Sequence, residues 1–203
     1  MNLRSGLEQL KAIKHYIIAA TLVFVGGIGL GAFDSESFRW MIDLQLEALQ
    51  KLVEETKTQP NEQWALFWLI FMNNVRVTLQ VIVSGVLFGI PPLIILIVNG
   101  ILLGYVGAVQ SEEHSFMKFM QGIAPHGLLE LPAIIVACAL GLRFGVLVSK
   151  WLIALPIASR SKAVAVQLRA FIKALIPLSL LLVGVLFIAA LIESTITLWL
   201  LRG

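Results

Sequence analysis

The stretch from Val77 to Val109 constrains this chain most, because it contains no charged side chain. A helix crosses the hydrocarbon core of a bilayer with about 20 apolar residues, so the stretch is too long for one span. It is interrupted by the sequence GIPP at 89–92, where two prolines remove backbone donors and disfavour continued helix. The sequence therefore predicts a helical hairpin whose two spans cover about 66–89 and 91–109.

Three more apolar stretches are long enough to cross a membrane, at about 16–33, 126–148 and 174–198. The chain is 59% hydrophobic and only 13% charged, which leaves too little polar material to cover a soluble core. In lipid, backbone polar groups must be paired within the protein, and long apolar runs achieve this as helices. We expect an all-α integral membrane protein of about five transmembrane helices, with residues 1–203 as a single membrane domain.

Basic residues predict how these spans are oriented. The amino-terminal segment carries Arg4, Lys11 and Lys14, and the connection 149–173 before the last span is also basic. Because cytoplasmic loops are enriched in Lys and Arg, both segments and the amino terminus are expected in the cytoplasm of a cell-membrane protein. The net charge of +3 then reflects topology, and no nucleic-acid partner is expected.

The first extracytoplasmic loop contains a helical pattern of its own. Over 36–57, apolar residues recur at helical spacing and charged residues take the other face. This predicts an extracytoplasmic amphipathic helix, either a cover packed on its own bundle or a docking surface for a partner. Within the connection 149–173, residues 158–173 have a weaker amphipathic pattern, which we interpret as an interfacial loop.

Small residues indicate how the spans pack. Glycine pairs spaced G-x-x-x-G let helix backbones approach closely where lipid gives no hydrophobic drive. Their number favours a compact bundle, with one pair left over for a homodimer. The four pairs are Gly27 and Gly31, Gly85 and Gly89, Gly100 and Gly104, and Gly141 and Gly145.

Polar residues inside the spans are costly in lipid, so each should face protein or water. Asn73, Arg76, Gln80 and Ser84 follow one another at steps of three and four, which places them on one helix face. Asn74 lies beside that stripe. In the third span Asn99 is the polar residue. Together these residues predict a polar seam between spans.

The segment PHGLLELPA, 125–133, predicts the other wall of that seam. Pro125 suits the first turn of a helix, and His126 and Glu130 project from one face because they are four residues apart. In the predicted topology they lie at the outer end of the fourth span. We expect Glu130 to pair with Arg76, with His126 and an asparagine completing the hydrogen bonds.

Three interpretations of this cluster stay open. It is a buried hydrogen-bond network that fixes helix register, a site for a divalent metal such as zinc on His126 and Glu130, or part of a small-molecule or proton pathway. Two metal ligands are incomplete, and the H-E-x-x-H pattern is absent. Neither a G-x-S-x-G motif nor a C-x-x-C pair is present, so we do not expect an enzyme.

Two segments of this chain are distinctive. They are GIAPHGLLELPA at 122–133 and GVLFGIPPLIILIVNGILLG at 85–104, the latter preceded by the asparagine pair at 73–74. Together they resemble the stage II sporulation protein M family. The matching motif residues are Pro125, His126, Gly127, Glu130, Leu131 and Pro132, with Asn74, Asn99 and Gly100 from the hairpin.

The resemblance implies a non-enzymatic membrane component. In spore formers such a protein works with two extracytoplasmic peptidoglycan-degrading partners during engulfment of the forespore, and relatives also occur outside spore formers. We therefore expect a homodimeric, multi-pass scaffold or anchor for envelope-remodelling proteins such as peptidoglycan hydrolases. The alternatives are a permease-like subunit that works with a cytoplasmic ATPase, and a metal-binding membrane protein.

Overall fold

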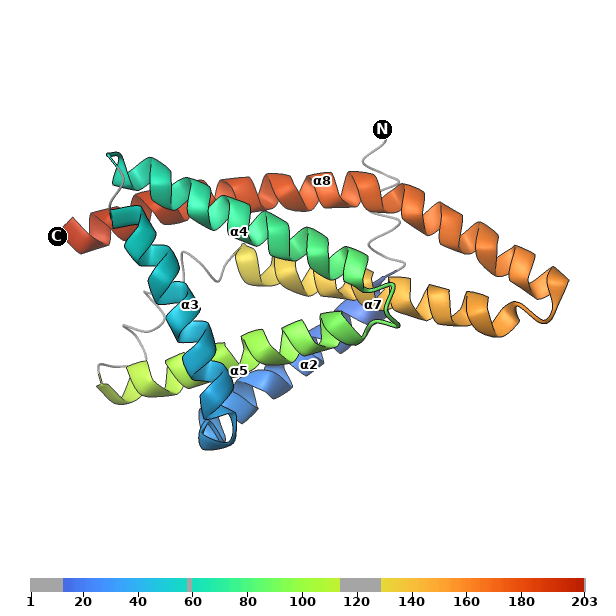
Figure 1. Cartoon of the computed structure of the whole chain (residues 1–203), viewed down its shortest axis with the longest axis horizontal. Helices are drawn as coiled ribbons and strands as arrows, with labels where there is room; N and C mark the ends of the chain where they lie inside the picture. Colours follow the sequence, from blue (N-terminus) through green and yellow to red (C-terminus); the bar gives the residue numbers. More distant parts are fainter. Residues whose placement is uncertain (1–12, 58–59, 114–128, 203) are drawn as a thin grey trace.

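The structure is a computed structural model, and it describes residues 13–57, 60–113 and 129–202. These residues form helices and turns (Figure 1). In that part of the chain, five helices are long and apolar enough to cross a membrane, which confirms the predicted all-α membrane fold. They are α2 (Lys14–Phe33), α4 (Glu62–Ser84), α5 (Ile90–Glu113), α7 (Glu130–Ala154) and α8 (Ala158–Arg202).

The predicted hairpin is present as α4 and α5. Helix α4 ends at Ser84, five residues before the predicted boundary, because 85–89 form the turn. The turn needs left-handed backbone at Phe88, with a φ of 58°, and at Gly89, with a φ of 76°. The two prolines then fall in the first turn of α5, where a missing N–H leaves no helical hydrogen bond unmade.

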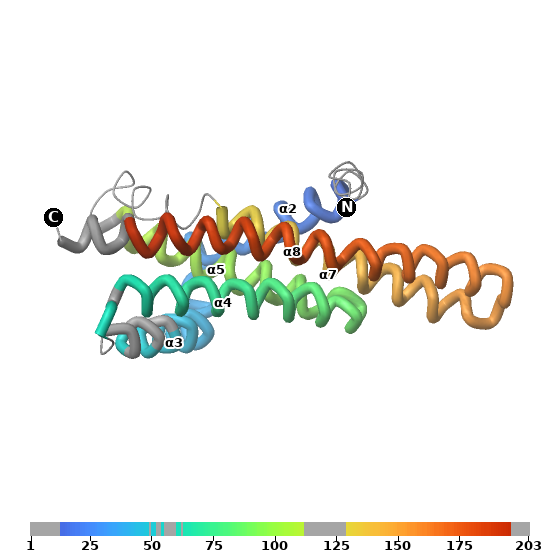
Figure 2. The backbone as a smooth tube through the Cα atoms, turned by 90° about the horizontal axis from the view of Figure 1, so that it is seen from above, coloured from blue at the N-terminus to red at the C-terminus, as the bar shows by residue number. Residues whose placement is uncertain are grey.

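The amphipathic segment predicted over 36–57 is also helical. It consists of a short 3-10 helix η1 (Glu36–Phe38) followed by α3 (Arg39–Lys57). Helix α3 contacts both α4 and α5. Figure 1 shows α4 and α5 diverging from their turn, with α3 crossing from one to the other near their far ends. Figure 2 places α3 and α4 toward one side of the molecule and α8 toward the other.

The glycine pairs join helices within the chain, as predicted for a compact bundle. A Cβ on Gly27 would lie 2.9 Å from the carbonyl oxygen of Ile97, and one on Gly31 would overlap the carbonyl oxygen of Ile101. Helices α2 and α5 are therefore in backbone contact. Gly85 and Gly141 bring α4 against α7 in the same way, since a Cβ on Gly85 would overlap the backbone of Gly141.

The segment 149–173 differs from the predicted loop, because it is almost entirely helical. Helix α7 continues to Ala154, a short turn containing Pro156 follows, and α8 begins at Ala158. From there to Ile176 no proline or glycine interrupts the sequence, and Lys, Arg, Ala and Leu are good helix formers. Helix α8 thus includes both the connection and the predicted span 174–198. The α7–α8 hairpin projects well beyond the α4–α5 turn (Figure 1).

Candidate polar site within the bundle

The best-defined polar contact in the bundle joins α4 to the start of α7. The side-chain amide of Asn74 donates a hydrogen bond through Nδ2 to Oε1 of Glu130, and both residues are half-buried. Glu130 is the first residue of α7. Its carboxylate therefore lies at the positive end of the helix dipole, near backbone N–H groups that have no partner within the helix.

On α4, this contact lies near the middle of the helix. Asn74 is 12 residues after the first residue of α4 and 10 before the last, which is about 18 Å and 15 Å along the axis at 1.5 Å per residue. The sequence placed the cluster at the outer end of the fourth span. Glu130 is the first residue of α7, and its partner Asn74 lies near the middle of α4. Helix α7 starts at Glu130, four residues after the predicted start at 126, and continues to Ala154.

The expected pair of Arg76 with Glu130 is not among the ion pairs of the described residues. Arg76 follows Asn74 by two residues, which turns it about 200° around the helix. When Asn74 faces α7, Arg76 therefore faces away, and its side chain is exposed. The carboxylate of Glu130 accepts a hydrogen bond from Asn74, which belongs to the asparagines predicted as secondary partners. Arg76, which we predicted as the main partner, faces away from it.

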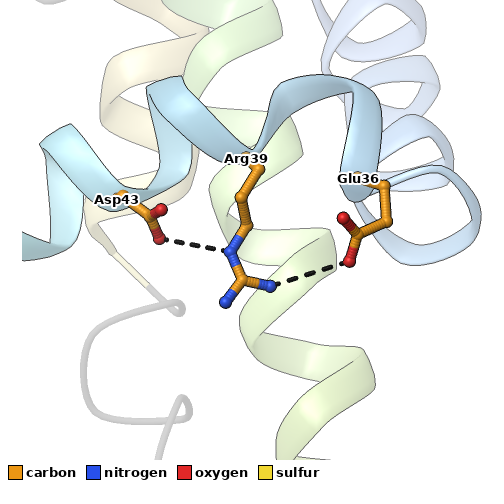
Figure 3. Close-up of polar contacts among 3 residues, drawn as sticks. All are labelled: Glu36, Arg39 and Asp43. Atoms are coloured by element: carbon orange, nitrogen blue, oxygen red, sulfur yellow. Dashed lines mark ion pairs between the residues drawn. The ribbon is translucent and has the colours of Figure 1, made fainter.

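The ion pairs that the structure does show lie on the amphipathic segment. Arg39 lies between two carboxylates, with Nε 3.4 Å from Asp43 and one terminal nitrogen 3.8 Å from Glu36 (Figure 3). Lys51 Nζ lies 2.7 Å from Glu47. All five side chains are largely exposed, so these pairs order a surface helix and contribute little to stability.

The remaining polar seam residues do not meet across the spans. Asn73, Arg76 and Gln80 are exposed on α4, and the hydroxyl of Ser84 donates to the carbonyl of Val81 in its own helix. Asn99 of α5 is exposed as well, and its amide donates to the carbonyl of Ile95, 2.8 Å away. The seam predicted from helical spacing is thus one interhelical contact and one exposed polar stripe.

Metal binding by this cluster stays a prediction. His126 lies outside the described residues, together with Pro125 and Gly127. Across 13–57, 60–113 and 129–202, no group of three or more His, Cys, Asp or Glu side chains is placed to hold a metal ion. Elemental analysis of the purified protein, alone and as His126→Ala and Glu130→Ala, tests for zinc directly.

The environments of two charged residues, Arg143 and Glu193, were not predicted from the sequence. The guanidinium carbon of Arg143 lies 4.9 Å from the ring centroid of Phe171, so α7 and α8 are joined by a cation–π contact. Glu193 of α8 is buried. One signal for Glu193 was available, because it is the first charge after the long uncharged run 174–192, whereas nothing marked Phe171.

Comparison with known proteins identifies a matching family. A family model for stage II sporulation protein M (SpoIIM) matches residues 19–198. The chain is 27% identical over 188 residues to an uncharacterized protein of Methanocaldococcus jannaschii, and the match covers 91% of this chain and 82% of that protein. No solved structure matches.

Proposed function

Because this chain belongs to the stage II sporulation protein M family, we propose that it is a non-enzymatic membrane scaffold that holds an extracytoplasmic envelope-remodelling protein. The proposed partner class is the peptidoglycan hydrolases, and the proposed contact surface is α3. The five spanning helices supply the anchor. The observation that carries the proposal is the exposed apolar pair on α3.

The proposed orientation follows from the basic residues of the projecting hairpin. Segment 144–173 contains no Asp or Glu, and its cations therefore favour the cytoplasmic side. Helix α3 lies toward the other end of α4, away from the hairpin (Figure 1). The proposal accordingly has the amino terminus in the cytoplasm and α3 outside. The cations are Lys150, Arg160, Lys162, Arg169 and Lys173.

Helix α3 presents apolar side chains on both of its faces. Ile42 is fully buried against the bundle, whereas Trp40 is 73% exposed and Leu44 is 60% exposed. Trp40 and Leu44 are four residues apart, so they form one outward patch, and Asp43 and Glu47 flank it. Large aromatic anchors dominate binding energy at protein interfaces. This patch suits an apolar pocket with a basic rim on an extracytoplasmic protein.

A binding measurement tests this role. The protein is reconstituted in nanodiscs and titrated with purified peptidoglycan hydrolases from the same organism, and the Kd is measured for the parent and for Trp40→Ser with Leu44→Ser. We expect the double variant to weaken binding by at least tenfold, since it removes the apolar anchors. Ile153→Ser, at an equally exposed apolar position on the opposite end, is the matched control and should leave binding unchanged. A Kd that is unchanged by Trp40→Ser with Leu44→Ser contradicts the proposal.

A second candidate function, a permease-like subunit with a cytoplasmic ATPase, is favoured by the α7–α8 hairpin. Its tip exposes Ile153, Leu155 and Ile157 between basic residues, in a position that reaches past the rest of the bundle. The same two variants separate the candidates. If Ile153→Ser abolishes stimulation of a co-purified ATPase while the α3 variant has no effect on it, the permease-like role replaces the scaffold.

A further inference from the structure

Three polar residues are exposed between the midpoint and the last turns of α4, a helix long and apolar enough to span a membrane. They are Asn73, Arg76 and Gln80, and we call them the α4 polar face. Arg76 is 14 residues from the start of α4 and 8 from its end, or about 21 Å and 12 Å along the axis. Long basic side chains reach the membrane surface when they are near a helix end, and Arg76 is not. The guanidinium therefore requires a polar partner within the membrane.

The rest of the chain, as far as the structure describes it, does not supply that partner. Within the apolar spans the structure describes two carboxylates. Glu130 accepts a hydrogen bond from Asn74, and Glu193 is buried in α8. No ion pair among the described residues involves Arg76. Asn74, which does face the bundle, lies on the opposite side of α4.

The glycine motifs also leave the α4 polar face as the remaining specific surface. A homodimer was expected to use one spare G-x-x-x-G pair, but all four pairs are taken within the chain. Gly27 and Gly31 meet α5, and Gly100 and Gly104 meet α2. Gly85 and Gly89 meet α7, and Gly141 and Gly145 meet α4, α5 and their turn. A second copy therefore has to dock on something other than these glycines.

We propose that a second copy of this chain covers the α4 polar face, so that the α4 helices of two protomers pair about a two-fold axis. In such an isologous interface each residue faces the same surface of its partner. The amides of Asn73 and Gln80 carry both donors and acceptors, so each of these two positions can pair with an amide of a second copy. Arg76 has donors only, and it lies between the two amides along the helix. Each guanidinium can donate to amide oxygens of the other protomer, one turn away from the opposite guanidinium.

Disulfide crosslinking in membranes tests the proposed surface. Cys138 is the chain's single cysteine and is buried, so Cys138→Ala provides a silent background. Leu69→Cys and Gln80→Cys place thiols on the α4 polar face or directly in line with it, and Leu180→Cys places one on an exposed apolar position of α8. We expect covalent dimers from positions 69 and 80 and none from 180. Crosslinking at 180 alone, or at none of the three, overturns the proposal.

The association constant gives a second readout that does not depend on thiols. Energy transfer between labelled copies in vesicles measures the association constant. We expect the variant with Asn73→Leu and Gln80→Leu to have an association constant roughly threefold to tenfold lower than the parent, which is the range that interhelical hydrogen bonds contribute. Gln167→Leu makes the same chemical change at an exposed position of the projecting hairpin and should have no effect. Equal association in all three proteins overturns the proposal. Neither readout uses an envelope partner, so the dimer and the scaffold role can fail separately.

Discussion

The contact between α2 and α5 differs from the polar face of α4 in how a helix can associate within a membrane. Between α2 and α5 the backbones come into direct contact at the glycines. On α4 the polar side chains of Asn73, Arg76 and Gln80 remain exposed. Lipid offers no hydrophobic drive for helix association, so contact must come either from close packing or from polar groups. The first contact is complete within one chain, whereas the second is the surface that we propose a second copy to cover.

The difference has a consequence for what a substitution does. At a glycine contact, added volume has no space to occupy and must separate two helices. At an exposed polar position, loss of a group leaves the fold of the chain intact and changes only what the surface can bind. Stability of the protomer should therefore respond strongly at the glycines and weakly at the α4 polar face.

The largest effect is expected from Gly31→Ala. Its Cβ would overlap the carbonyl of Ile101, so α2 and α5 must move apart, at a cost of about 3 kcal/mol in the free energy of unfolding. Equilibrium unfolding in mixed micelles measures this. Gly29→Ala is the matched control, because a Cβ there meets nothing within 4 Å, and it should be neutral or stabilise by about 0.5 kcal/mol. Equal effects of the two changes would show that α2 and α5 do not touch as described.

An intermediate effect is expected at the contact of Asn74 with Glu130. Asn74→Leu removes a donor from a half-buried carboxylate and should destabilise the protomer by about 1 to 3 kcal/mol. A double-mutant cycle with Glu130→Gln should give a coupling energy of about 1 kcal/mol for Asn74. The same cycle with Arg76→Leu, under conditions that keep the protein monomeric, should give none. A larger coupling for Arg76 than for Asn74 would reinstate the ion pair expected from the sequence.

A smaller effect is expected at Arg143, the intramembrane arginine whose partner is an aromatic ring. Phe171→Leu keeps an apolar side chain but removes the ring beneath the guanidinium, and should cost about 1 kcal/mol in unfolding free energy. Arg76→Leu has no ring contact to lose and serves as the comparison. If Phe171→Leu left stability unchanged, the cation–π contact would not contribute to the joining of α7 and α8.

The smallest effect is expected from the Glu47 and Lys51 pair on α3. Its hydrogen bond and charge attraction lower the pKa of Glu47 and raise the pKa of Lys51. The lowered carboxyl pKa favours the fold above the ordinary pKa of Glu, and this is lost as pH falls. The raised ammonium pKa favours the fold below the ordinary pKa of Lys, and this is lost as pH rises. Lys51→Ala should return the Glu47 pKa toward its ordinary value in an NMR titration, with no measurable change in stability.

The sequence predicted the spans well because their signal is local. A charge-free run, a G-x-x-x-G pair and the GIPP break each report on the residues that carry them, and the structure confirms the hairpin and the glycine contacts. Helical spacing also placed Asn73, Arg76 and Gln80 on one face correctly. Which helix that face meets is not a local property, since a rotation of about 200° decides whether Arg76 or Asn74 faces Glu130. The helical connection 149–173 was missed because a basic segment was interpreted as a loop, although only the short turn at Pro156 interrupts its helices.

Helix α8 has a mechanical consequence. Its 45 residues form one rod about 67 Å long, which exceeds the hydrocarbon thickness of a bilayer by about a factor of two. A displacement of the basic tip of the hairpin would be transmitted along this helix toward its other end. There Phe187 of α8 contacts Phe67 and Phe71 in the first half of α4. Pro177 is the point of least stiffness on the way, because its ring removes a hydrogen bond from the helix interior. We therefore expect a displacement of the hairpin tip to be felt at the aromatic contact between α8 and α4.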